Sequence, residues 1–247
     1  MKKSLPDDFY FSQHALNLFK QCPLKFRFRY LDGFFWPGSW GQTAESQKLI
    51  DQGKKFHKLA NRYYSRGWIP EKTGKNKQLV KWFSRLTNFC PYQEQGSYKP
   101  EYELRLNVME LKLMAKYDLI FIDHSRSHLI IYDWKTGKRP PEYKKMSGNL
   151  QTSVYLLVMA RAVNEYFVQA GDITLDSLKL CYWNPRHPKR DINIDYNMKR
   201  YSRDKEKISN LISQIREYSY EDFKINKKQK KCTDCRFQAV CGPRKNS

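Results

Sequence analysis

The run Ile130-Ile131-Tyr132-Asp133-Trp134-Lys135 ends an apolar strand pattern in Asp-x-Lys. Residues two apart in a β-strand project to the same face of the sheet, so Asp133 and Lys135 leave the strand end together. Taken alone, Asp-x-Lys is common, and its ordinary interpretation is a hairpin whose acid pairs with nearby lysines. What it means here depends on what the neighbouring strand brings to the same edge.

A second acid, Asp118, lies within the preceding strand pattern at 111–122, and residues 123–127 predict a turn after it. The register of this turn sets Asp118 opposite residue Asp133, with Cβ atoms about 5 Å apart. Two carboxylates that close repel each other unless a divalent cation lies between them. Mg²⁺ or Mn²⁺ would polarise a phosphoryl oxygen and acidify a bound water, and Lys135 would orient that water or neutralise charge on phosphorus. The pattern favours phosphodiester hydrolysis.

The surrounding pattern predicts an α/β fold, with a central sheet flanked by helices. Pro23 predicts a break in the first helix, and Gly171 predicts the end of the fourth. We expect one domain over 1–247 with its catalytic core at 101–184. The expected strands are 101–108, 111–122 and 129–134, which form an antiparallel meander, and 178–183; the expected helices are about 12–31, 43–66, 76–89, 148–170 and 197–220.

Flanking elements supply further candidate site residues. Gln151 and Tyr155 share one face of the 148–170 helix, although apolar neighbours make Tyr155 a reasonable core residue as well. His57 offers a neutral imidazole nitrogen to a metal ion, although a lone histidine is more often structural. Glu101 and Glu103 share a strand face and are candidates to complete the metal shell; the alternative is an exposed edge strand.

Charge narrows the choice of partner. The chain has 46 Lys and Arg against 25 Asp and Glu, a formal net charge of +21. No amphipathic stretch combines a basic face with a clean apolar one, so nucleic acid is favoured over a membrane. No apolar run approaches the ~20 residues that span a bilayer, and the first residues lack the apolar core of a signal peptide. We therefore expect an intracellular protein, cytoplasmic and associated with the nucleoid.

Aromatic residues alternate with basic ones at 26–30, 58–64 and 183–190. This composition is typical of grooves that bind single-stranded nucleic acid with little base specificity. The alternative is that Phe26 and Tyr30 are core residues.

Three of the six cysteines, Cys232, Cys235 and Cys241, have the close spacing of metal ligands. In a reducing compartment, clustered cysteines are more often ligands than disulfide partners. A zinc ion or an iron–sulfur cluster is typically held by four ligands, and four cysteines suit either one. The three clustered cysteines therefore need a fourth ligand from elsewhere in the chain. Cys90 and Cys181 are expected to be small buried hydrophobes.

Together these segments resemble the RecB/AddB-like branch of the PD-(D/E)XK nucleases, which includes the CRISPR-associated RecB-like exonucleases. The resemblance spans most of the chain. One departure is Ala115, where the family usually has Gly three residues before its first acid. The residues that carry the resemblance are Ser12 to Phe26 with Cys22-Pro23, the helix with Gly53 and His57, Asp118, Asp133-Trp134-Lys135-Thr136-Gly137, which is similar to Asp-Tyr-Lys-Thr-Gly, and Gln151 with Tyr155.

This resemblance implies a restriction-endonuclease-like fold with a central mixed sheet. It implies that Mg²⁺ or Mn²⁺ is bound by His57, Asp118, Asp133 and the backbone carbonyl of Trp134. By the same resemblance Lys135 is catalytic, and Gln151 and Tyr155 position the substrate or the lysine. Apart from the resemblance, Glu101 and Glu103 are also candidates for a second shell around the metal ion.

The resemblance also implies that Cys22 joins Cys232, Cys235 and Cys241 to hold a [4Fe–4S] cluster rather than zinc. Such a site would staple segments 12–31 and 225–247 around the core.

The implied function is a metal-dependent DNA nuclease, an exonuclease on single-stranded or frayed ends, in DNA repair, recombination or CRISPR-related processing. The chain has no Walker motif, so any unwinding must come from a partner, such as a helicase or a CRISPR or repair protein. Two alternatives stay open: a non-catalytic Fe–S DNA-binding module in a larger complex, and a zinc-stabilised RNA-binding protein.

Overall fold

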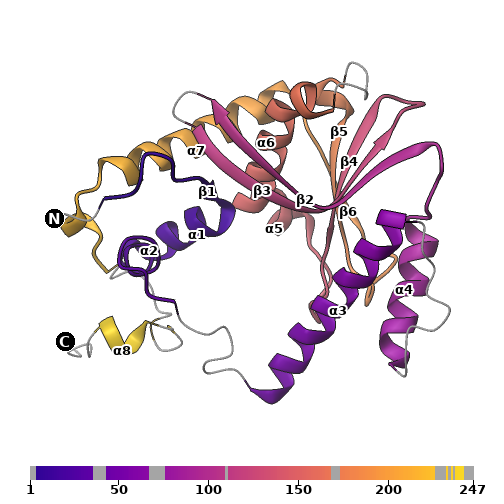
Figure 1. The fold of residues 1–247 in the computed structure, drawn as a ribbon, viewed down its shortest axis with the longest axis horizontal. Coiled ribbons are helices and arrows are strands. Elements are labelled where there is room, and N and C mark those ends of the chain that lie inside the picture. Colours follow the sequence, from indigo (N-terminus) through magenta and orange to yellow (C-terminus); the bar gives the residue numbers. More distant parts are fainter. Residues whose placement is uncertain are drawn as a thin grey trace.

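The computed structural model describes residues 4–35, 43–66, 76–108, 111–167, 173–225, 232, 235 and 237–241. Its centre is a mixed sheet flanked by helices, which confirms the predicted α/β class (Figure 1). None of the described helices is both long and apolar enough to cross a bilayer. The strands are β1 Phe11–Ser12, β2 Gly96–Val108, β3 Leu111–Asp123, β4 His128–Trp134, β5 Leu178–Trp183 and β6 Ile192–Asp195.

Strand β3 is the hub of the sheet. It pairs with β2 along one edge, antiparallel and over nearly its whole length. Its other edge carries two shorter strands, β1 at Leu113 and Met114 and β4 from Leu119 onward. Strand β4 then pairs parallel with β5, and β5 antiparallel with β6. The meander at β2, β3 and β4 is as predicted, whereas β1 and β6 were not expected.

The register between β3 and β4 is the one that the turn predicts. Leu119 faces Tyr132, and the same register, continued by one residue on each strand, sets Asp118 opposite Asp133. The pairs between the two strands end at Leu119 and Tyr132, so both acids lie where the strands begin to separate. Both carboxylates are thus delivered to one edge by backbone pairing alone.

Helices cover both faces of the sheet (Figure 1). On one face, α1, α6 and α7 pack on the larger apolar core; on the other, α3 and α4 form a second core with Leu119, Trp134 and Trp183. The helices are α1 Gln13–Gln21, α2 Pro23–Tyr30, α3 Ala44–Arg66, α4 Lys77–Phe89, α5 Tyr143–Gly148, α6 Leu150–Tyr166, α7 Met198–Glu217 and α8 Gln238–Cys241, with 3₁₀ turns at Leu175–Ser177 and Tyr220–Asp222.

Local chemistry explains several helix ends. The Ser12 side chain caps α1 by accepting from the Ala15 amide. Cys22 both ends α1 and precedes α2, and Pro23 occupies the first turn of α2, where its missing amide proton costs nothing. The predicted break at Pro23 is therefore confirmed. Helix α6 is shorter than expected, because it ends at Tyr166, and its predicted cap at Gly171 lies outside the described residues.

Candidate active site

The two acids of the β3–β4 fork differ in environment. Asp118 Oδ2 accepts a hydrogen bond of 2.7 Å from the Trp134 amide, which closes the end of the strand pair. The Asp133 side chain is 4% exposed, whereas that of Asp118 is 19% exposed. One carboxylate is therefore buried against the core, and the other faces the opening.

Helix α3 brings His57 over this fork. His57 Nδ1 lies 3.2 Å from Asp118 Oδ1, and Nε2 donates to the Trp134 carbonyl over 3.1 Å. The approach is close because Gly53 has no side chain: a Cβ there would lie 2.6 Å from Thr136 Oγ1, in the loop that follows β4. Gly53 therefore sets how near His57 comes to the acids.

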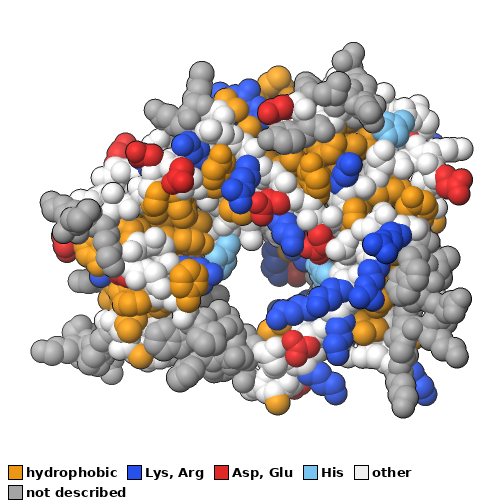
Figure 2. Space-filling view, viewed as in Figure 1, with side chains coloured by type: hydrophobic (Ala, Val, Ile, Leu, Met, Phe, Trp, Pro, Cys, Tyr) orange, Lys and Arg blue, Asp and Glu red, His pale blue; other side chains and the backbone are white. Residues whose placement is uncertain are grey.

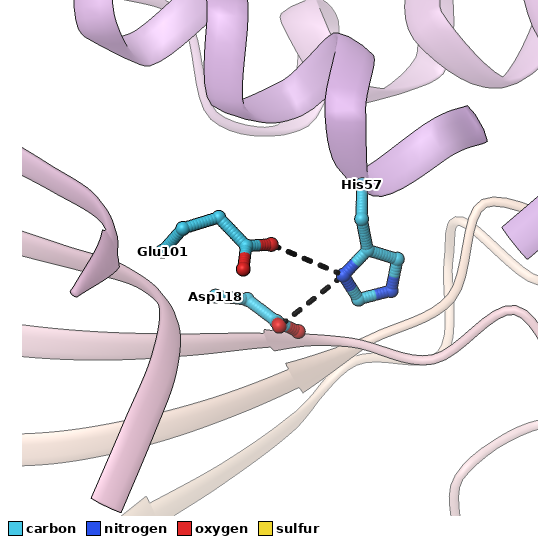
Figure 3. A group of neighbouring side chains, drawn as sticks. All are labelled: His57, Glu101 and Asp118. Atoms are coloured by element: carbon cyan, nitrogen blue, oxygen red, sulfur yellow. Dashed lines mark ion pairs between the residues drawn. The ribbon is translucent and has the colours of Figure 1, made fainter. Parts of the chain in front are cut away.

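Glu101 joins His57 and Asp118 in one group, in which one ligand atom from each residue lies within 4.8 Å of the others. Figure 3 shows both carboxylates directed at the imidazole of His57. Glu101 also pairs with Lys116 over 2.7 Å, and its φ of 49° is a left-handed conformation that is costly in a strand.

This arrangement modifies the expected ligand set. Glu101, which the sequence offers as a candidate to complete the metal shell or to lie in a second shell, is in the group with His57 and Asp118. Glu103 does not belong to that group, because it pairs with Arg105 over 3.0 Å.

Lys135 lies on the inner side of the site. Its ammonium is 2.6 Å from Asp133 Oδ1, donates to Gln151 Oε1 over 3.0 Å, and sits 5.1 Å from the ring centroid of Tyr182. Gln151 Nε2 in turn donates to Asp133 Oδ2 over 2.7 Å. Lys135, Asp133 and Gln151 thus form a closed triangle of contacts.

Tyr155 holds the backbone next to Asp118. It is 7% exposed, and its hydroxyl donates to the Lys116 carbonyl over 2.6 Å. Its backbone carbonyl accepts from the Tyr117 hydroxyl over 2.9 Å, so helix α6 and strand β3 are tied together twice. Tyr155 is in this respect the core residue that its apolar neighbours suggested, and it fixes the strand that carries Asp118.

Burial raises the pKa of Asp133 to about 6; the charge of Lys135 opposes this shift, and the charge of Asp118 adds to it. For His57, burial lowers the pKa, but the hydrogen bond and negative charge of Asp118, with Asp133 and Glu101, outweigh burial and raise the pKa above its usual value. The negative charge of Asp118, Asp133 and Glu101 around His57 is a place where a bound cation would be stabilised. The oxygen and nitrogen donors present suit Mg²⁺ or Mn²⁺.

A second loop clamps the loop that follows β4. The Asn184 side chain is fully buried and donates to the carbonyls of Gly137 (2.9 Å) and Arg139 (3.3 Å). Arg186 donates to the Thr136 carbonyl, and His187 Nε2 to that of Lys138. The sequence shows only a basic and aromatic stretch at these positions, so the positioning role of Asn184 was missed.

The four cysteines that were expected to form one site do not lie at the spacing of a single metal ion. Cys22, Cys232, Cys235 and Cys241 are all within the described part of the chain, and no three of their sulfur atoms lie within 4.8 Å of one another. Tetrahedral zinc with bonds of about 2.3 Å holds its sulfur atoms roughly 3.8 Å apart, so these positions do not fit zinc. The two chain ends meet instead through backbone and aromatic contacts.

Comparison with known proteins assigns the family. A model of the PD-(D/E)XK nuclease superfamily matches residues 10–242. The chain belongs to this superfamily. The matched range includes His57, Asp118, Asp133 and Lys135, and thus the whole site of this PD-(D/E)XK protein. No curated protein matches the sequence.

Two solved structures are similar to this PD-(D/E)XK protein. One is a "Putative exonuclease" from Eubacterium rectale, with a TM-score of 0.52 and 11% identity, covering 96% of this chain and 95% of the other. At that identity the likeness concerns the fold alone. The second is SSO0001, with a TM-score of 0.34 and 16% identity, covering 81% of this chain and 97% of the other.

Proposed function

We propose that this protein is a metal-dependent DNA nuclease that hydrolyses phosphodiester bonds at single-stranded or frayed DNA ends. The observation that carries the proposal is the placement of Lys135. Its ammonium is held by Asp133 and Gln151 at the fork where Asp118 and His57 gather. A lysine serving only as a surface charge would not need a buried carboxylate and an amide to fix it.

The metal ligands in this proposal are His57, Asp118, Asp133, the Trp134 carbonyl and, in addition, Glu101. Bound Mg²⁺ or Mn²⁺ would supply Lewis-acid polarisation of the phosphate and an acidified water. Such an ion is supported by the gathering of donor atoms from His57, Glu101 and Asp118 within 4.8 Å of one another.

Lys135 supplies the positive charge that meets the scissile phosphate, or holds the attacking water in line. Gln151 orients Lys135 and Asp133 together, since one amide group contacts both. Tyr155 keeps β3, and with it Asp118, in register with the fork.

The choice of DNA ends as the substrate rests on the net charge of the chain and on its similarity to a solved structure. The formal charge of +21 favours a polyanion, and the similar solved structure carries the name exonuclease. We assign the chain to the RecB/AddB-like branch on His57, Gln151 and Tyr155. Strand separation would then come from a helicase or from a CRISPR or repair partner, in repair, recombination or CRISPR-related processing, and the protein would act beside the nucleoid.

The test compares end-labelled linear DNA with circular single-stranded DNA, in Mg²⁺ or Mn²⁺, for the wild type and Lys135→Ala. Lys138→Ala is the matched control, because Lys138 lies in the same loop but pairs with the exposed Glu45. Metal-dependent loss of linear DNA by the wild type and the control, but not by Lys135→Ala, is expected. Survival of the circle identifies an exonuclease.

The same experiment can also reject the nuclease proposal. Tight DNA binding without cleavage by any of the three proteins, under anaerobic conditions, would replace the nuclease with a non-catalytic DNA-binding module. The joint presence of Asp118, Asp133 and Lys135 with their mutual contacts argues against that reading.

A [4Fe–4S] cluster at Cys22, Cys232, Cys235 and Cys241 is a second, separate proposal. Its support is that the segments that carry these cysteines meet: the rings of Phe28 and Phe237 are 5.6 Å apart, and the Leu24 amide donates to the Lys224 carbonyl. An iron–sulfur cube holds thiolates farther apart than a single ion does. Anaerobically purified wild type should contain about four iron atoms per chain and absorb near 400 nm, and Cys22→Ser should lose both; iron-free wild type would reject the cluster.

A further inference from the structure

Helix α3 carries an unbalanced run of positive charge. From residue 52 to its end at Arg66 the helix has five Lys and Arg and no Asp or Glu. Lys54, Lys55 and Lys58 are exposed, and no ion pair joins any of them to a carboxylate among the described residues. Other exposed lysines of the protein, such as Lys138 and Lys145, do have such partners.

The helix dipole does not explain these three lysines. Basic residues stabilise a helix within its last turn, and α3 reaches that turn only at Arg66. Lys54 and Lys58 lie two to three turns earlier, in the middle of the helix. Like charges at i and i+4 are mildly destabilising for an isolated helix, so their placement works against local stability.

Lys54 and Lys58 share a side of the helix with His57. Lys54 precedes His57 by three residues, and Lys58 follows Lys54 by four, so the three side chains project from neighbouring positions along about one turn, or 5.4 Å, of helix. Since His57 contacts Asp118, the lysines flank the fork of the active site.

Figure 2 shows where this charge lies on the molecule. A row of Lys and Arg side chains runs over α3, along one border of a hollow between α3 and the α1–α2 region. Carboxylates appear at the edge of the hollow nearest the sheet.

We propose that the exposed side of α3 marked by Lys54 and Lys58 is a phosphate track, which binds the backbone of a DNA strand on one side of the scissile phosphate. The inference rests on the proposed nuclease function and adds the path of its substrate. The occupant is a single strand of DNA, chosen by charge complementarity: successive phosphates leaving the fork meet ammonium groups about one helical turn apart. The track reads no bases, because lysine contacts with phosphate carry no sequence information.

The test is binding of a fluorescent oligo-dT single strand, with divalent cations removed by EDTA, across a range of salt concentrations. The variant is Lys54→Gln with Lys58→Gln. Its control is Lys199→Gln with Lys205→Gln, two exposed lysines of α7, on the other face of the sheet. Both double variants lose the same charge.

Loss of two phosphate contacts lowers the slope of log K against log salt by about 1.4 for a single strand and weakens binding at low salt on the order of tenfold. The α3 variant should show both changes and the α7 control neither. Turnover of bis(p-nitrophenyl) phosphate, too small to reach the track, should be equal in both.

Equal affinity and equal salt slope for the two double variants would overturn the track. That failure is distinct from failure of the nuclease proposal, since binding is measured without cleavage. Wild type that binds DNA through Lys54 and Lys58 but never cleaves it would reject the nuclease and keep the track. Wild type with no measurable DNA binding would reject both.

Discussion

Gln151 donates from its side-chain amide to Asp133 Oδ2 over 2.7 Å, at the first turn of helix α6 and the end of strand β4. The same amide accepts from Lys135 through its carbonyl oxygen. One uncharged group therefore satisfies both members of an oppositely charged pair, which a carboxylate or an amine in its place would not do. The orientation of the proposed catalytic lysine depends on a helix that is distant in sequence.

Replacement of Gln151 by Leu should reduce kcat by about 10- to 100-fold, the usual cost of losing a residue that orients a metal ligand. The expected cause is a misplaced Lys135 ammonium, so KM for DNA should change little. Steady-state kinetics on linear DNA measure both. Gln214→Leu, an exposed change on α7, serves as the control, and an unchanged kcat for Gln151→Leu would remove the residue from the catalytic group.

The pKa of Asp133 predicts how metal-free stability depends on pH. Burial raises this pKa to about 6 from 3.8, so between pH 3.8 and 6 the folded chain holds a proton that the unfolded chain releases. The contribution of Asp133 to the free energy of unfolding is largest below pH 3.8. It is lost as the pH rises through 6, and the loss is up to about 3 kcal/mol. His57, with its raised pKa, loses its contribution only above pH 6.5.

Urea unfolding in EDTA from pH 4 to 7 measures this dependence. The wild type should lose stability across that window relative to Asp133→Asn, which has no proton to lose, and Mg²⁺ or Mn²⁺ should restore it most at the higher pH values, where the carboxylate is charged. Asp195→Asn, a change at an exposed acid, should follow the wild type. Parallel curves for wild type and Asp133→Asn would contradict the assignment.

The sheet edge that carries the acids could be predicted from the sequence because its determinants are local. Alternation marks β3 and β4, the turn between them sets the register, and the register alone places Asp118 opposite Asp133. Short strands escaped prediction for the same reason: β1 and β6, at two and four residues, contain too few positions for a period to appear.

The group around His57 needed tertiary information. Glu101 enters it through a left-handed backbone that no strand pattern indicates, and Asn184 acts on carbonyls 45 and 47 residues away in the chain. The cysteines show the reverse case, in which a sequence pattern predicts more than the structure contains. Their ligand-like spacing in the sequence does not place the sulfur atoms at single-ion distances in the described part of the chain.

Gly53→Ala tests whether the close approach of α3 sets the position of His57. The added Cβ would lie 2.6 Å from Thr136 Oγ1, so the Thr136 side chain must turn away or the helix and the loop must move slightly apart. Alanine also favours a helix by about 1 kcal/mol over glycine, so the melting temperature should hold or rise while kcat falls. Thr136→Ala in the same chain removes the clashing oxygen and should restore part of the activity; no rescue would locate the defect elsewhere.

Asn184→Ala tests the clamp on the loop that carries Thr136, Gly137 and Arg139. The part-buried hydrogen bonds to the Gly137 and Arg139 carbonyls are lost, which should cost about 1 kcal/mol of stability. Activity should fall further than the loss of stability explains, because the loop beyond Lys135 is released. The start of the loop stays fixed, since the Lys135 amide donates to the Trp183 carbonyl over 2.7 Å. His187→Ala removes one exposed contact to the same loop and is the control.

The measurements are the urea midpoint and kcat on linear DNA, at a temperature where both variants are folded. Equal kcat for the two variants would show that the clamp serves stability alone, whereas a fall confined to Asn184→Ala would make the loop after β4 a determinant of catalysis.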